Sequence, residues 1–117
     1  MIEQALTYHG APAAVWEAAS GADYTPEAFA ADGFIHTSIG AATLCDALNR
    51  YYRDDDRPYV ALLIDLGRVR APWEIVRHAD RDGEFPHIHG PLNRDAVLRV
   101  LPLGRAPDGG FLPPPEA

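Results

Sequence analysis

The spacing of hydrophobic positions divides the chain into a helix-rich first half and a strand-rich second half. In residues 39–53, apolar side chains recur every three or four residues, which is the spacing of one helical face. The stripe on this expected helix consists of Ala41, Cys45, Leu48 and Tyr52. Residues 59–66, YVALLIDL, are instead almost continuously apolar and rich in β-branched side chains. That pattern is typical of a strand buried on both faces.

Glycine, proline and polar capping residues mark the ends of the other expected elements. Pro12 suits the first turn of one helix, which Gly21 stops, and Thr25 caps a second helix that ends at Gly33. Asn93 is expected to start a single helical turn. In chain order, the expected elements are a strand at 3–10, helices at 11–20 and 25–33, a strand at 34–38, the helix at 39–53, and strands at 59–66, 73–79, 85–90 and 97–103.

This order, with helices early and strands late, predicts an α+β domain. Its sheet should be antiparallel or mixed, because a doubly wound parallel sheet needs strands and helices in regular alternation. We expect residues 1–103 to form a single globular domain. Residues 104–117, which are rich in glycine and proline, are expected to form a poorly ordered tail.

The amino-acid composition argues against several classes of function. The net charge of −7 over 117 residues disfavours binding to nucleic acid or to anionic membranes, although a few arginines can still hold a small anion. All ten basic residues are arginine, which excludes Schiff-base chemistry and a P-loop lysine. The single cysteine, Cys45, lies on the expected buried stripe and reads as an inert core thiol. With no leader or long apolar run, we expect a cytoplasmic location.

Two short segments, FIHTS at 34–38 and FPHIHGPL at 85–92, carry most of the candidate chemistry. Residues two apart on a strand point to the same face. The first face carries Phe34, His36 and Ser38, and the second carries Phe85, His87 and His89. We expect the two faces to meet across one pocket, which would place the imidazoles of His36 and His87 within about 10 Å of each other.

The histidines also allow other interpretations. The His-x-His spacing of His87 and His89, with His36 or His9 as a third ligand, would suit zinc, iron or nickel. Each histidine can equally be a half-buried hydrogen-bonding residue, and this is the interpretation that we favour for His78, which lies beside a turn.

At GFIHTS and FPHIHGPL the chain resembles a bacterial family catalogued as domain of unknown function 952. The resemblance runs over most of residues 5–103 and also includes Tyr8-His9 and Trp73-Glu74. Family members usually carry tyrosine at the position of His89, which favours a pocket-lining role there over metal ligation.

The family in turn resembles a compact version of the ADP-ribosyltransferase fold. This resemblance implies short N-terminal helices packed on a mixed or antiparallel sheet, with NAD or a related nucleotide as the small-molecule ligand. It implies that the first strand, FIHTS and FPHIHG each supply one of the motifs that surround NAD. The implied catalytic residues are His36, His87 and Ser38, and the implied cofactor-binding residues are His9, Tyr8, Gly10, Phe34, Phe85 and His89.

The implied reaction is transfer or hydrolysis of ADP-ribose. Cleavage of the nicotinamide–ribose bond creates an oxocarbenium-like centre, which a carboxylate or a polarised ribose hydroxyl stabilises. The sequence places no glutamate on the face of His87, and Glu74 would reach the pocket only if its strand lay beside it. A non-catalytic module that binds a nucleotide or an ADP-ribosylated group, and a small histidine-dependent metalloenzyme, are the alternatives.

Overall fold

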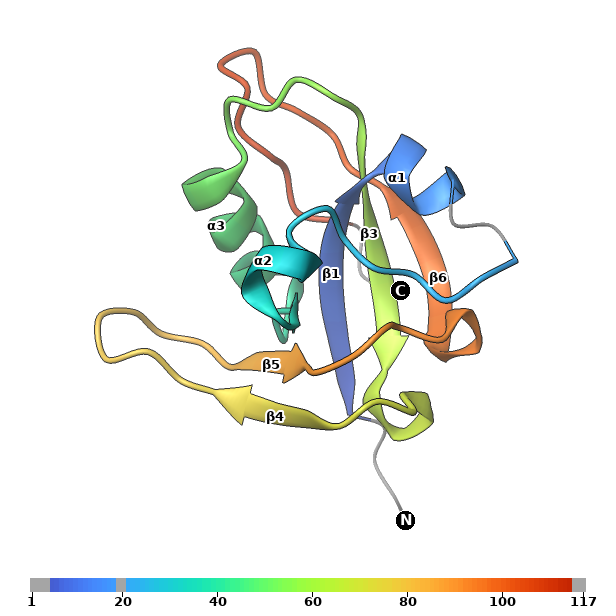
Figure 1. Cartoon of the computed structure of the whole chain (residues 1–117). Coiled ribbons are helices and arrows are strands. Elements are labelled where there is room, and N and C mark those ends of the chain that lie inside the picture. The colour runs from blue at the N-terminus through green and yellow to red at the C-terminus, as the bar shows by residue number, and fades with distance from the viewer. Residues whose placement is uncertain (1–4, 19–20, 115–117) are drawn as a thin grey trace.

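The computed structural model describes residues 5–18 and 21–114, in which six strands form two separate sheets (Figure 1). The strands are β1 (Leu6–Pro12), β2 (Ile35–His36), β3 (Tyr59–Asp65), β4 (Trp73–Val76), β5 (Phe85–Ile88) and β6 (Val97–Pro102). The helices are α1 (Ala13–Ala18), α2 (Phe29–Asp32) and α3 (Ala41–Tyr51), with 3₁₀ turns η1 (Leu66–Arg68) and η2 (Arg94–Ala96). The α+β class and the order of helices and strands are as predicted.

Both sheets are antiparallel, with the orders β1-β3-β6 and β2-β5-β4. Leu62 and Ile64 of the central strand β3 are fully buried. They share one core cluster with Ile35 and Ile88, which pair across β2 and β5. The second sheet therefore packs its apolar face onto the first, and its other face is left for polar and aromatic side chains.

The first two helices are shorter than predicted. β1 continues through Pro12, so α1 begins at Ala13. Proline is tolerated there because β1 is an edge strand of its sheet, where its missing N–H need not join a ladder. Thr25 is not the N-cap of α2, since that helix begins after Ala28, but Gly33 ends it in a left-handed conformation as predicted. The predicted helix end at residues 19–20 lies outside the described residues.

The buried face of α3 is rotated relative to the predicted stripe. Ala41, Leu44 and Leu48 are buried, whereas Cys45 is half-buried and Tyr52 is exposed. A second core cluster packs this buried face against β1 and β3. In the described part of the chain, no helix is long and apolar enough to cross a membrane.

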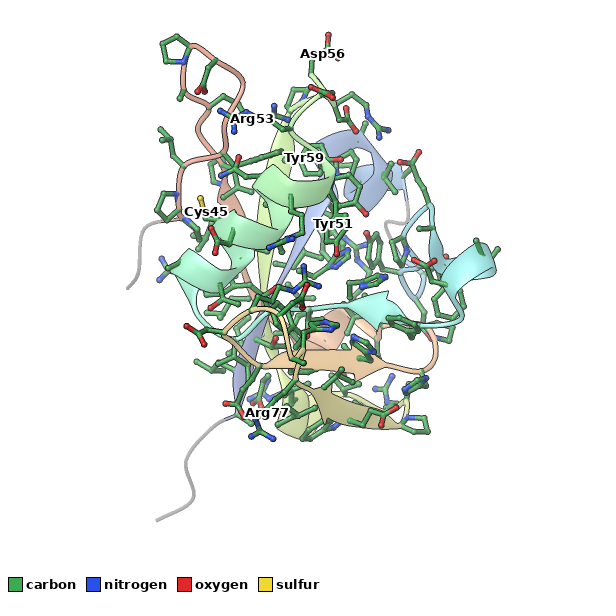
Figure 2. The ribbon with its side chains drawn as sticks, turned by 90° about the vertical axis from the view of Figure 1, so that its left-hand side faces the viewer. Cys45, Tyr51, Arg53, Asp56, Tyr59 and Arg77 are labelled. Carbon is green, nitrogen blue, oxygen red and sulfur yellow. The ribbon has the colours of Figure 1, made fainter. Side chains whose placement is uncertain are left out.

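The prediction of a poorly ordered tail is wrong for residues 104–114. Phe111 is only 3% exposed and joins the cluster beneath α3. The Arg105 guanidinium lies 3.7 Å from the centre of its ring, and the Cys45 thiol donates a hydrogen bond of 3.0 Å to its carbonyl. Figure 2 shows Cys45 on the side of α3 that faces this segment. Because a buried aromatic anchors it, the segment is part of the fold.

Candidate functional site

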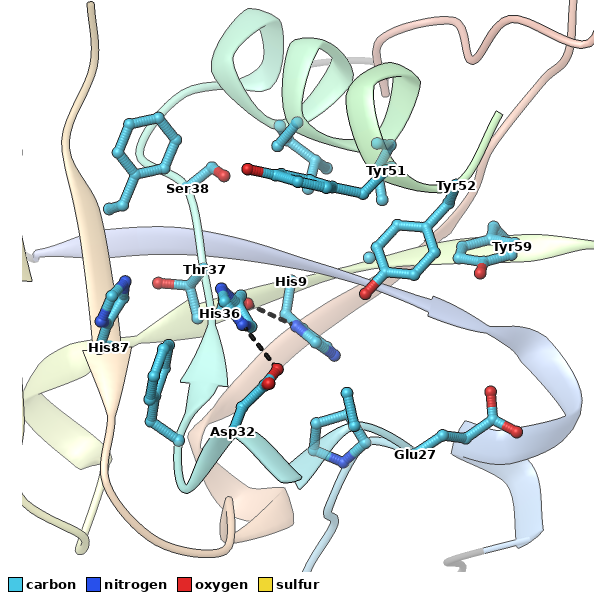
Figure 3. Close-up of a pocket in the computed structure, with 18 of the residues that line it drawn as sticks. His9, Glu27, Asp32, His36, Thr37, Ser38, Tyr51, Tyr52, Tyr59 and His87 are labelled. Atoms are coloured by element: carbon cyan, nitrogen blue, oxygen red, sulfur yellow. Dashed lines mark hydrogen bonds and ion pairs between the residues drawn. The ribbon is translucent and has the colours of Figure 1, made fainter. Parts of the chain in front are cut away.

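A pocket of about 620 Å³ opens beside the two sheets, with α2, α3 and the loop before α2 contributing to its wall (Figure 3). This volume lies in the usual range of small-molecule sites, about 300–1,000 Å³. Its wall is rich in rings, supplied by Tyr24, Phe34, Tyr51, Tyr52, Tyr59 and Phe85 together with four histidines, His9, His36, His78 and His87.

β2 and β5 bring the two predicted faces together. His36 and His87 are direct partners in the antiparallel ladder, and their ring centroids lie 5.6 Å apart. The predicted proximity of these two imidazoles is therefore confirmed. Phe34 stacks on His87 at 4.1 Å with an interplanar angle of 13°, and its centroid is 4.5 Å from that of His36. Strand alternation explains the cluster, because Ile35 and Ile88 point to the core.

A carboxylate that the sequence analysis missed lies beside His36. Asp32 is the last residue of α2, and its Oδ2 is 2.9 Å from His36 Nε2. Gly33, with φ of 79°, turns the chain between helix and strand, which lets the two side chains meet. The sequence signal was the aspartate directly before a helix-ending glycine. Both side chains are partly exposed, so the pair is accessible from the pocket.

His9 forms a buried part of the wall through two hydrogen bonds. Its Nδ1 is 2.7 Å from the carbonyl oxygen of His36, and its Nε2 is 2.9 Å from the hydroxyl of Tyr24. A carbonyl oxygen only accepts, so Nδ1 carries the proton and Nε2 accepts from Tyr24. Burial lowers the pKa of His9 to about 4 and raises the pKa of Tyr24. Both groups are therefore neutral near pH 7.

Tyr24 links the pocket to the core. Its ring centroid lies 5.5 Å from that of His9 and 5.4 Å from that of Trp16, which meets it edge-on. Trp16 is itself covered by Arg94, whose guanidinium lies 3.6 Å from the centre of the indole. Tyr24 could not be identified from the sequence, because it lies in a loop whose position depends on contacts with distant segments.

The structure brings seven of the nine predicted site residues to the pocket, namely His9, Gly10, Phe34, His36, Ser38, Phe85 and His87. Tyr8 and His89 are not among the residues that line it. Tyr8 precedes His9 on β1 and packs in the core cluster under α3. His89 follows the end of β5, and its Nε2 lies 2.8 Å from a carboxylate oxygen of Glu74. β4 does neighbour β5, with Glu74 opposite His87, but Glu74 also does not line the pocket.

The histidines do not assemble a metal-binding set in the part of the chain that the structure describes. No three or more His, Cys, Asp or Glu side chains gather there in positions that could hold an ion. His87 stacks against Phe34, and His89 turns toward Glu74. The arrangement thus gives no support to the metalloenzyme alternative.

Charges are unevenly distributed around the pocket. Glu27 accepts hydrogen bonds from Arg57, which holds the pKa of this carboxyl below its usual value. Arg57 is also bonded to Asp55. Burial, with a smaller contribution from His36, lowers the pKa of His87. His9, Tyr24 and His87 are therefore neutral near pH 7, while the carboxylates of Glu27 and Asp32 lie on one side of the pocket (Figure 3).

Residues 10–100 match the family described as Protein of unknown function (DUF952), and the chain belongs to that family. The predicted family membership is thereby confirmed. Among solved structures, the chain is similar to the protein CC0527 from Caulobacter crescentus. The crystal structure of CC0527 is 23% identical with a TM-score of 0.76, over 92% of this chain and 94% of that chain.

A double mutant of CC0527 gives a similar result, with 26% identity and a TM-score of 0.73 over 92% of this chain and 94% of that chain. The solution NMR structure of CC0527 is 28% identical with a TM-score of 0.65, over 91% of this chain and 90% of that chain. These likenesses show that the fold is shared. No curated protein matches the sequence significantly.

Proposed function

We propose that the pocket binds NAD or a related nucleotide and promotes transfer or hydrolysis of ADP-ribose. The observation that carries the proposal is the Asp32–His36 pair, which lies directly beside the stacked rings of Phe34 and His87. A carboxylate beside a flat aromatic platform suits cleavage of a nicotinamide–ribose bond, because the carboxylate stabilises the oxocarbenium-like centre that forms. An ADP-ribosyltransferase-like fold and a cytoplasmic location belong to the same proposal.

The aromatic walls support a ligand with a planar ring. His87 lies on one side of the pocket, and Tyr51 and Tyr52 lie across it on the side of α3 (Figure 3). A nicotinamide or adenine ring inserted between these walls would gain stacking energy of about 1–3 kcal/mol per base. The three motif segments add support, because each of them contributes a histidine to the same pocket, namely His9, His36 and His87.

The residues can be assigned chemical roles. As the C1′–N bond breaks, its electron pair leaves with neutral nicotinamide, and the Asp32 carboxylate stabilises the positive charge that develops on the ribose. His36 holds that carboxylate through the 2.9 Å contact, and the Ser38 hydroxyl is available to a ribose hydroxyl. Water or an acceptor hydroxyl then attacks C1′ and passes its proton to His87, whose lowered pKa keeps the imidazole neutral near pH 7.

Asp32→Asn tests this assignment, because it removes the charge and keeps the shape. We expect the variant to bind ADP-ribose, which lacks the cationic ring, as the parent protein does. Nicotinamide release from NAD should be slowed about 100-fold, since the lost interaction is strongest in the transition state. His36→Ala and His87→Ala should slow nicotinamide release and, unlike Asp32→Asn, should also weaken ligand binding, because they remove parts of the ring cluster. Asp56→Asn is a matched control, because Asp56 is exposed on the turn before β3, away from the pocket (Figure 2).

Binding is measured by thermal shift and calorimetry, and turnover by chromatography of released nicotinamide. A nucleotide at a hundred times its Kd should stabilise the fold by about 2.7 kcal/mol, a shift of several degrees in Tm. If NAD, ADP-ribose and nicotinamide at millimolar concentration all leave Tm unchanged, the proposal is wrong.

A non-catalytic nucleotide-binding module is the second candidate. It is favoured by the pairing of both pocket carboxylates, since Asp32 contacts His36 and Glu27 contacts Arg57. Tight binding of ADP-ribose without any release of nicotinamide from NAD, in the parent protein and in Asp32→Asn alike, would establish this alternative.

A further inference from the structure

Arg81 is a pocket residue that neither the sequence motifs nor the proposed reaction uses. It lies in the connection between β4 and β5 and borders the pocket. Its guanidinium is 5.4 Å from the ring centre of Phe85 and 5.7 Å from that of Tyr51, and its Nη1 donates a 3.2 Å hydrogen bond to the Tyr51 hydroxyl. These contacts with α3 and β5 hold the cation against the pocket wall.

The other edge of this guanidinium has no acceptor in the described part of the chain. Nε is buried and makes no hydrogen bond, and Arg81 forms no ion pair with a described carboxylate. Arg77 in the same connection differs, because it pairs with Glu84. A buried donor without an acceptor is costly, and each one in a folded protein calls for an explanation. The Nε–Nη2 edge of arginine fits two oxygens of one phosphate or carboxylate group.

Arg81 places a positive charge at the end of the pocket opposite the carboxylates. Tyr51, which it contacts, lies across the pocket from Asp32 and Glu27 (Figure 3). A ligand that spans the pocket would thus meet carboxylates at one end and an unpaired cation at the other. The nucleotide of the proposed function has this character, since its nicotinamide ring is cationic and its diphosphate is anionic.

We propose that Arg81 binds a phosphate group of the pocket's ligand, so that the site selects nucleoside phosphates over free nucleosides. This inference rests on the proposed function and deepens it, because it names the group that the ligand must carry. A small shift of the guanidinium that admits a phosphate oxygen beside the buried Nε would satisfy this donor and keep the bond from Nη1 to Tyr51.

The test compares Arg81→Gln with the parent protein by calorimetry, using ADP-ribose and adenosine as probes. Loss of a charge-assisted hydrogen-bond pair should weaken ADP-ribose about 10- to 100-fold and leave adenosine nearly unchanged. Arg81→Lys should recover only part of the affinity, because an ammonium lacks the planar fork. Arg77→Gln is the matched control, since it removes the same charge from the same connection but lies outside the pocket. Circular dichroism checks that each variant is folded.

A second measurement separates this inference from the proposed function. Pyrophosphate is titrated into ¹⁵N-labelled parent protein while the Nε–H resonance of Arg81, assigned by its loss in Arg81→Gln, is followed. A saturable shift of that resonance without binding of NAD or ADP-ribose would support the anion site and overturn the nucleotide proposal. Equal affinity of the parent and Arg81→Gln for ADP-ribose would overturn the role of Arg81 alone. No shift with pyrophosphate and no nucleotide binding would overturn both.

Discussion

Acidification from pH 7 to pH 4 should destabilise the folded protein through His9. Burial lowers the pKa of this imidazole from its ordinary value of 6.5 to about 4. Between these values the unfolded chain binds a proton at His9 and the folded chain does not. The stability that neutral His9 contributes is therefore fully present above pH 6.5 and is lost as the pH falls toward 4.

The size and the cause of this loss of stability follow from the surroundings of His9. A tenfold difference in proton affinity corresponds to about 1.4 kcal/mol, so His9 should lower the free energy of unfolding by about 3 kcal/mol between pH 7 and pH 4. The cause is burial, which leaves a charged imidazole without solvent, and Nε2 of His9 already accepts a hydrogen bond from Tyr24 inside the protein. Protonation would place a second donor against that hydroxyl, with little room for water.

Urea denaturation of the parent protein and of His9→Gln at several pH values between 7 and 4 measures the effect. Glutamine keeps a hydrogen-bonding side chain and does not titrate, so the variant should show a flatter pH dependence. His87, whose pKa is also lowered, contributes with the same sign in both proteins and cancels in the comparison. Parallel stability curves for the two proteins, or a His9 resonance that titrates near pH 6.5, would contradict this role of His9.

Three further predictions concern packing. Gly10→Ala should lower the free energy of unfolding by about 1–3 kcal/mol, because the added Cβ would lie 2.6 Å from Leu48 Cδ2. Urea denaturation should show that most of this cost disappears when Leu48 is also replaced by alanine. An equal cost with and without the Leu48→Ala substitution would contradict the clash. Phe111→Ala should cost about 3–5 kcal/mol in the same assay, whereas a cost near zero would mean that the C-terminal segment adds nothing to the core. Cys45 should react slowly with a thiol reagent at pH 8 in the folded protein, because burial raises its pKa. Phe111→Ala should accelerate the reaction, because it uncovers the thiol. Rapid reaction of the parent protein would contradict the protection of Cys45.

Most of what the sequence could predict about the site follows from the alternation of side chains between the two faces of a strand. In β2 and β5 it separates Ile35 and Ile88, which enter the core, from His36 and His87, which face the pocket. This pattern depends only on the pleat of each strand, so it can be read locally. The order of helices and strands could be predicted for the same reason, since hydrophobic spacing is a short-range property.

The features that were missed depend on non-local contacts. Asp32 reaches His36 only because the chain turns at Gly33, and the backbone of Tyr24 is fixed by pairing with Leu92. The division into two sheets likewise depends on which strands pair, and many pairings suit the same strand sequences. Phe111 has few apolar neighbours in sequence, so its burial under α3 gave no periodic signal.

The contact between Trp16 and Tyr24 gives the protein an intrinsic optical reporter. The sequence has two tryptophans, of which Trp16 is buried directly behind Tyr24 of the pocket wall and Trp73 is partly exposed on β4. A Trp73→Phe variant would leave a single indole, in edge-on contact with the Tyr24 ring that lines the pocket. Occupancy of the pocket could then be followed in real time by fluorescence, with no label attached to the protein or to the candidate ligand.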